Sequence, residues 1–178
     1  MKKHNVVKSL ALALGSAALL WGTINLPASD TLSRNAAALR ANGGTTFDLL
    51  PTAVPGVFTH TVNGIAQVSL LGNCSVHADV IVQFSTNPDE PAILNGSLTF
   101  TTADGATTLT THVEGTGTPD PANPNSFLNF QYQVRFTGGS GRFAAARGKA
   151  AINGAALFTS ASTGKATWTL QGYVVTPP

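Results

Sequence analysis

Apolar and polar residues alternate along most of the chain beyond residue 45. The clearest run is 127–136, where the apolar residues Leu128, Phe130, Tyr132, Val134 and Phe136 occupy every second position. Successive side chains of a strand point to opposite faces, so this run predicts a strand with one buried and one wet face. The same pattern marks 76–84, 94–101 and 165–174, with weaker runs at 45–50, 56–62, 65–71, 106–114 and 149–159.

Turn-forming residues separate these runs. The dipeptide Asn63-Gly64 is the one that tight hairpin turns prefer, and Ala103-Asp104-Gly105 and Ser162-Thr163-Gly164 are similar in character. The segment from Thr116 to Asn125 holds three prolines, which predicts a loop. The sequence therefore predicts eight or nine short strands, mostly joined as hairpins.

A sheet of hairpin-linked strands has to hide its edges. Closure into a barrel removes them, and a two-sheet sandwich is the other solution. We expect an all-β fold, an antiparallel closed barrel of about eight strands preceded by an N-terminal signal segment. A barrel of about eight strands is either filled by side chains or able to hold one small ligand.

Composition narrows the class of protein. Only 10% of the 178 residues are charged and 43% are hydrophobic, which argues against a disordered chain and a coiled coil. The single cysteine, Cys74, excludes an intramolecular disulfide framework and a cysteine-cluster zinc site. The length suits one ordinary domain.

The N-terminus has the layout of a secretory signal peptide. Lys2, Lys3 and Lys8 precede an apolar stretch, 10–21, that is shorter than a membrane span. We expect a signal peptide at 1–28, with cleavage between 28 and 41, then a flexible lead-in at 29–44 and a barrel domain at 45–178. The alternative is an uncleaved anchor at 10–26. With the signal peptide, the predicted location is secreted or periplasmic.

Cleavage changes the charge of the protein. The chain has 10 basic and 8 acidic residues, and removal of the three N-terminal lysines leaves 7 against 8. The mature protein is then slightly acidic, with no basic patch for nucleic acid or an anionic membrane. We expect neither as a partner, and the oligomeric state stays open.

A glycine-rich segment, 138–148, is the most distinctive stretch. Gly138, Gly139 and Gly141 allow backbone angles that other residues rarely adopt. A single helical turn can follow over 142–146, and Gly148 would end it. In that turn, Phe143 would place an apolar side chain at one end of the barrel. The segment resembles the G-G-T-G-K/R-F-x-x-A-R/T-G signature of the dirigent and allene oxide cyclase-like β-barrels, especially their bacterial secreted relatives. The resemblance implies an eight-stranded barrel with an apolar interior. Plant members of the family act on small apolar substrates, but none of their catalytic residues carries over to this sequence.

Other reactive groups form no recognisable motif. His60, His77 and His112 are candidate metal ligands, yet only the pairs His77/Asp79 and His112/Glu114 share a strand face, and we expect no metal or cofactor. Cys74 and His77 lie on opposite faces of a strand, which argues against a catalytic dyad.

The basic residues near the glycine segment allow two interpretations. Arg135, Arg142, Arg147 and Lys149 either form an anion-binding rim at one barrel mouth or are solvated surface charges.

Three functional hypotheses remain. The first is a barrel that binds a small apolar ligand inside, lined by Phe84, Phe100, Phe130, Tyr132, Phe136 and Trp168. The second is a dirigent- or cyclase-like enzyme, for which Tyr132 and Glu114 are the candidate interior polar groups. The third is a structural surface or matrix domain whose barrel is filled. Without a catalytic motif, the sequence favours a binding protein over an enzyme.

Overall fold

The structure is a computed structural model, and it describes residues 35–177 apart from 88–89 and 121, without the side chains of 124–128. The signal peptide expected at 1–28 and its alternative, an anchor, lie outside the described residues.

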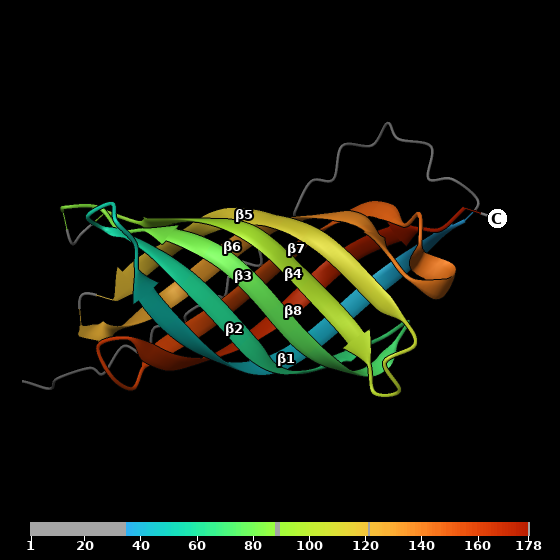
Figure 1. Cartoon of the computed structure of the whole chain (residues 1–178), viewed down its shortest axis with the longest axis horizontal. Helices are drawn as coiled ribbons and strands as arrows, with labels where there is room; N and C mark the ends of the chain where they lie inside the picture. Colours follow the sequence, from blue (N-terminus) through green and yellow to red (C-terminus); the bar gives the residue numbers. More distant parts are fainter. Residues whose placement is uncertain (1–34, 88–89, 121, 178) are drawn as a thin grey trace, which may run out of the picture. The chain divides into compact units, whose positions relative to one another are not determined.

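Eight strands make up the described chain, and each pairs antiparallel with the next (Figure 1). β8 also pairs with β1, which closes the sheet and confirms the predicted all-β barrel. A short 3-10 helix, η1 (Gly141–Phe143), lies between β6 and β7. The strands are β1 (Ala36–Pro51), β2 (Val57–Val68), β3 (Gly72–Gln83), β4 (Ala92–Thr102), β5 (Thr108–Asp120), β6 (Asn123–Gly139), β7 (Arg147–Phe158) and β8 (Thr163–Val175).

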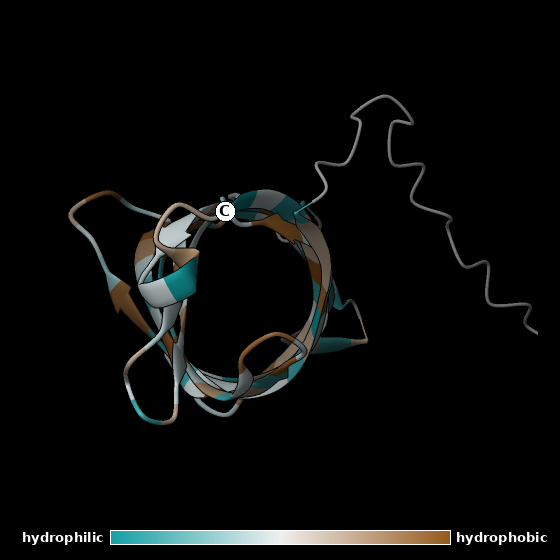
Figure 2. Cartoon of the chain, turned by 90° about the vertical axis from the view of Figure 1, so that its right-hand side faces the viewer, coloured by the Kyte–Doolittle hydropathy of each residue, from teal (hydrophilic) through white to brown (hydrophobic). Residues whose placement is uncertain are grey.

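Alternation along each strand divides the barrel into an inner and an outer face. In β3, every second residue from Cys74 to Val82 is buried, and the residues between them are exposed. A slip of one residue would turn this whole apolar set outward, so the alternation also fixes the register between strands. Figure 2 looks along the barrel from the end that carries η1, with the strands forming a ring.

The first strand is longer than the sequence predicts. Residues 36–44, expected to be part of a flexible lead-in, belong to β1 and pair with β8 from Ala36↔Val175 to Gly44↔Thr167. Alanine, asparagine and glycine are weak strand formers, so the local pattern does not reveal this segment. Pairing on both sides, with β2 and β8, supplies the order that propensity lacks. Cleavage within Ala36-Ala37-Ala38 would therefore shorten β1.

The hairpin expected at Asn63-Gly64 is wrong. Both residues lie inside β2, which joins the runs 56–62 and 65–71 into one strand, and the chain turns only beyond Val68. Gly64 is needed for close packing rather than for a turn. A Cβ there would lie 2.2 Å from the carbonyl oxygen of Gly44 and 2.7 Å from the Cα of Thr45.

The proline-rich loop expected from Thr116 to Asn125 is also shorter than predicted. β5 continues to Asp120 and β6 begins at Asn123. The pairing shifts register on both sides of Pro119. Proline has no N–H to donate to the ladder and is tolerated at such irregularities. Two strands can therefore extend into a segment that reads as a loop.

The two ends of the barrel are built differently. At the end that carries η1, which we call the η1 end, large side chains from several strands are almost completely buried; they are Leu39, Val68, Phe100, Leu109, Phe136, Phe143, Leu170 and Val174. The opposite end, which we call the distal end, carries the β1–β2, β3–β4, β5–β6 and β7–β8 connections. There Phe58, Phe84 and Phe158 are only partly buried.

Candidate functional site

A cavity of about 90 Å³ occupies the distal half of the barrel. One water needs roughly 10–15 Å³ of such space, so the cavity has room for a small organic molecule. All eight strands contribute to its wall, and nearly every lining side chain is apolar. The lining residues are Thr45, Phe47, Leu49, His60, Val62, Val76, Ala78, Val80, Val82, Phe84, Ala92, Leu94, Leu98, Val113, Gly117, Phe130, Tyr132, Ile152, Ala156, Phe158, Ala166 and Trp168.

Aromatic rings lie over glycines in the wall of this cavity. A Cβ on Gly43 would lie 2.4 Å from the Trp168 ring, and one on Gly164 would lie 2.2 Å from the Phe47 ring. Gly154 is covered in the same way by Phe130, with 2.3 Å between the added Cβ and the ring. Each ring takes the space that a neighbouring side chain would otherwise fill. Large residues therefore line this half of the barrel without filling it.

His60 is the polar group that stands out in the cavity wall. It lies on β2 between the inward-facing residues Phe58 and Val62, and both of its ring nitrogens are buried without a hydrogen-bond partner. The Phe47 ring lies edge-on to the imidazole, 4.9 Å away between ring centroids. Burial lowers the pKa of His60 to about 4, while the exposed carboxylate of Asp48 on the neighbouring strand partly opposes this shift. The imidazole is therefore neutral near pH 7, with one donor and one acceptor available.

Thr45 is a second buried polar group with no partner. Its hydroxyl oxygen is buried without a hydrogen bond, whereas the other buried threonine, Thr111, donates to the carbonyl of Leu98 at 3.1 Å. Leaving a buried polar group unpaired costs about 1–3 kcal/mol. Thr45 and His60 both impose this cost, and both line the cavity.

Tyr132 brings a third polar side chain to the same wall. It lies on β6 beside Phe130, with 5.6 Å between the ring centroids. Burial raises the pKa of the Tyr132 hydroxyl, so the phenol stays protonated. The cavity is thus apolar with a few neutral polar atoms, which is the usual make-up of a small-molecule site.

The six predicted interior residues divide between the two halves of the barrel. Phe84, Phe130, Tyr132 and Trp168 line the cavity. Phe100 and Phe136 do not, because they belong to the tightly packed η1 end. Sequence reasoning grouped His60 with possible metal ligands and did not consider Thr45. The sequence does carry one signal: His60 occupies an alternate position that should face inward, between the apolar residues Phe58 and Val62.

The glycine-rich segment closes the η1 end. Gly138, Gly141 and Gly148 have positive φ angles of 143°, 57° and 141°, which only glycine adopts easily. Gly139 has an ordinary φ, but a Cβ there would lie 2.1 Å from the carbonyl oxygen of Thr108. The helical turn expected over 142–146 is a single 3-10 turn at 141–143, and it places the Phe143 side chain in the core.

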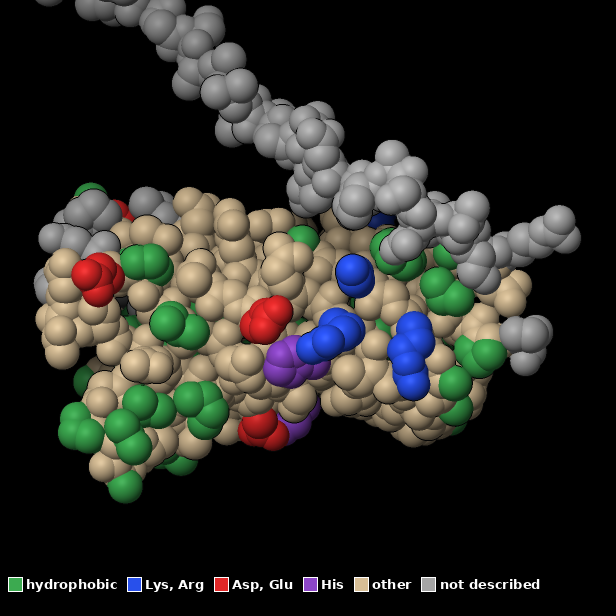
Figure 3. Space-filling view, turned by 90° about the horizontal axis from the view of Figure 1, so that it is seen from above, with side chains coloured by type: hydrophobic (Ala, Val, Ile, Leu, Met, Phe, Trp, Pro, Cys, Tyr) green, Lys and Arg blue, Asp and Glu red, His purple; other side chains and the backbone are tan. Residues whose placement is uncertain are grey.

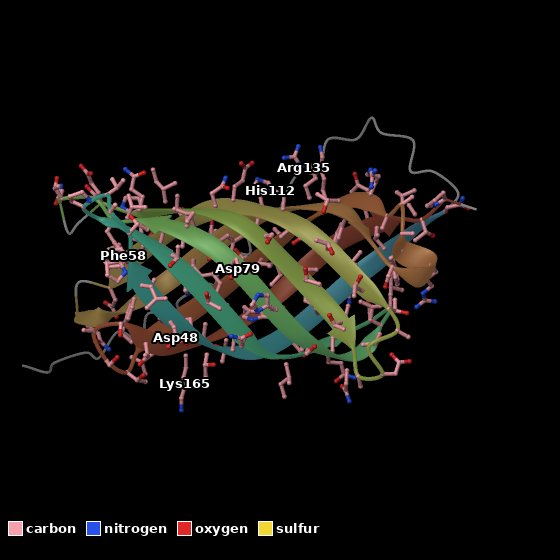
Figure 4. The ribbon with its side chains drawn as sticks, viewed as in Figure 1. Asp48, Phe58, Asp79, His112, Arg135 and Lys165 are labelled. Carbon is pink, nitrogen blue, oxygen red and sulfur yellow. The ribbon has the colours of Figure 1, made fainter. Side chains whose placement is uncertain are left out.

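Most ionisable side chains lie on the outer face instead. Figure 3 shows a band of acidic, histidine and basic side chains over one side of the barrel, and Figure 4 labels Asp79, His112 and Arg135 within it. His112 is the cross-strand neighbour of Arg135, which in turn neighbours Lys149. Glu114 is exposed and lies 3.9 Å from His112. The prediction that Glu114 is a polar group of the barrel interior is therefore wrong.

The three histidines do not converge. His77 lies on the outer face with Asp79, 3.1 Å away, and Asn63, 2.8 Å away, whereas His60 faces inward. No group of three or more candidate metal-ligating side chains occurs within the described residues.

Two of the clustered arginines support the backbone around the glycine segment. Arg142 donates to the carbonyl of Leu70, and Arg147 donates to the carbonyls of Thr137, at 3.0 Å, and Ala146, at 2.8 Å. The Arg142 guanidinium also lies 5.0 Å from the centre of the Phe143 ring. These side chains are at the η1 end, away from the cavity.

Cys74 is a buried core residue. It faces the barrel interior from β3, and burial raises the pKa of its thiol. His77 is on the opposite, outer face of the same strand, as expected.

Comparisons with known proteins add one similar structure. No family model matches the sequence, and a search of the curated proteins finds no match. Among solved structures, a pterocarpan synthase dirigent protein aligns with a TM-score of 0.41 and 11% sequence identity, over 82% of this chain and 90% of that one. Within the described residues, no helix has the length and apolar character needed to cross a membrane.

Proposed function

We propose that this chain is an exported β-barrel protein that binds a small apolar molecule in the distal half of its interior. The cavity carries the proposal, since it is walled by apolar side chains yet keeps unpaired polar atoms. A filled structural barrel has no need of either feature. The resemblance of the glycine-rich segment to dirigent and allene oxide cyclase-like proteins agrees with a small apolar ligand.

A binding protein accounts for the site better than a dirigent- or cyclase-like enzyme. The only charged side chain that sequence reasoning placed inside, Glu114, is on the outer surface. The polar groups that line the cavity are His60, Thr45 and Tyr132, and a neutral imidazole and two hydroxyls suit hydrogen bonding. These groups orient a ligand and stabilise little charge.

The test is native mass spectrometry of protein purified from its host, alongside analysis of an organic extract. We expect a small organic molecule to co-purify in stoichiometric amount. Ala156→Leu places a larger side chain in the cavity and should abolish this co-purification. Ala155→Leu is the matched control, because the neighbouring Ala155 is exposed on the outer face and its substitution should leave binding unchanged.

The proposal fails if wild-type protein has the bare chain mass and also binds no added toluene in solution. It fails equally if Ala156→Leu, folded as judged by circular dichroism, binds as well as wild type.

A further inference from the structure

The two ring nitrogens of His60 indicate which chemical groups a ligand in the cavity should carry. A neutral imidazole presents one N–H donor and one lone-pair acceptor, and here neither is used within the protein. Other buried polar side chains find a backbone partner when one is within reach, as Thr111 does with Leu98. His60 is enclosed by apolar side chains of β1 and β3, including Phe47, Leu49 and Val80. The described side chains and backbone leave both imidazole nitrogens open to a molecule bound in the cavity.

The surroundings of His60 decide the charge of that molecule. The carboxylate that acts on it, Asp48, is on the outer face of β1, and its influence is smaller than that of burial. Among the described residues, the side chains that line the cavity include no Lys, Arg, Asp or Glu. An anionic or cationic ligand would therefore be buried without a counter-charge, at a cost that an uncharged ligand avoids.

Resting on the function proposed above, the geometry points to an uncharged, largely apolar ligand that carries a hydroxyl group, and to His60 as the residue that recognises the hydroxyl. A hydroxyl is a small group that can accept a hydrogen bond from the imidazole N–H. It can also donate one to the lone pair of the other ring nitrogen. The rest of the ligand lies against the apolar wall formed by residues such as Val82, Phe130 and Trp168.

Thr45 lies deeper along the same wall. It pairs with Gly64, four residues beyond His60 on β2. At about 3.4 Å per residue, this four-residue offset separates the two residues by roughly 14 Å along the strand direction. A molecule of one ring reaches only one of them, so recognition at His60 can be measured with a one-ring probe.

The experiment compares three probes of nearly equal shape by calorimetric titration at pH 7. These are p-cresol, which carries a hydroxyl; toluene, which lacks it; and p-toluate, which carries a charge. We expect p-cresol to bind about tenfold more tightly than toluene, the ratio that one buried hydrogen bond supplies. We expect p-toluate to bind more weakly than either.

His60→Phe should remove this preference and leave toluene affinity nearly unchanged, because a phenyl ring keeps the shape and loses both nitrogens. His112→Phe is the matched control on the outer face and should leave all three affinities unchanged. The imidazole ¹⁵N shifts of His60 give a second measurement, and they should move with p-cresol and not with toluene.

Each outcome separates the two proposals. If toluene binds as tightly as p-cresol, or if His60→Phe retains the preference, the hydroxyl assignment is overturned while the apolar site stands. If p-toluate binds best, the ligand is an acid and the assignment is also overturned. If no probe binds, the proposed function itself falls.

Discussion

The two halves of this barrel use the same alternating strands for opposite purposes. In the η1 end, Phe100, Phe136 and Phe143 belong to the core and are almost completely buried. In the distal half, the aromatic rings of Phe47, Phe130 and Trp168 lie over glycines of neighbouring strands, and the axis stays hollow. The number of aromatic residues is therefore a poor guide to whether a barrel is filled. What decides it is whether the inward position facing each ring is another side chain or a glycine.

Polar groups follow the same division. Thr111, in the packed region, has its hydroxyl bonded to a carbonyl, whereas Thr45 and His60, in the hollow half, have no partner. Unpaired buried groups reduce stability, and they tend to be retained where a site uses them.

The largest expected difference between the halves is in the free energy of unfolding. Phe136→Ala should destabilise the protein by about 3–5 kcal/mol, because it opens a new cavity in tightly packed core. Phe84→Ala should cost only about 1–2 kcal/mol, because this side chain is partly exposed and borders space that is already empty. Urea unfolding of both variants measures the difference, and equal losses would mean that the halves are packed alike.

The next effect is the loss of stability in acid to which the buried His60 contributes. Its pKa in the folded protein, about 4, is below the ordinary value of 6.5, so the unfolded chain binds the proton more readily. Stability is then full above pH 6.5 and falls as the pH drops from 6.5 towards 4, by at most about 3 kcal/mol. His60→Phe should lose less stability than wild type over this window by that amount. Identical pH profiles for the two proteins would show that His60 is not buried in its neutral form.

The smallest effect contrasts the two buried threonines. Thr45→Val removes an unpaired hydroxyl and should raise the free energy of unfolding by up to about 1 kcal/mol. Thr111→Val removes a hydroxyl that is bonded to Leu98 and should lower it by about 1 kcal/mol. Thermal unfolding of the two variants measures both changes in the free energy of unfolding, which should have opposite signs. A loss of stability in Thr45→Val would indicate that its hydroxyl has a partner in solution.

Strong alternation was enough to predict the strands that matter most for the fold. The run 76–84 overlaps most of β3 and the run 127–136 lies inside the longer β6, since burial of one face dictates both the pattern and the structure. The beginning of β1 and the continuity of β2 were not predictable, because they depend on partners far away in sequence. Gly64 illustrates this: its dipeptide with Asn63 favours a turn, but contact with Gly44 and Thr45 places it in a strand.

The candidate site was predicted only in part for a related reason. The alternation of apolar and polar residues predicts that Phe84, Phe100 and Trp168 face inward. It does not predict where along the barrel axis each side chain lies, or which of them are in contact. The importance of His60 depends on the absence of a partner, which is a property of its surroundings in space rather than of its neighbours in sequence.

The buried side chain of Phe143 and its neighbours close the barrel at the η1 end. On the function proposed above, a molecule held in the distal half would leave through the distal end, because the described side chains of the η1 end are tightly buried. Exchange would then be sequential, with the bound molecule leaving before the next one enters. Its residence time would then depend on the distal end, where the rings of Phe58, Phe84 and Phe158 are only partly buried.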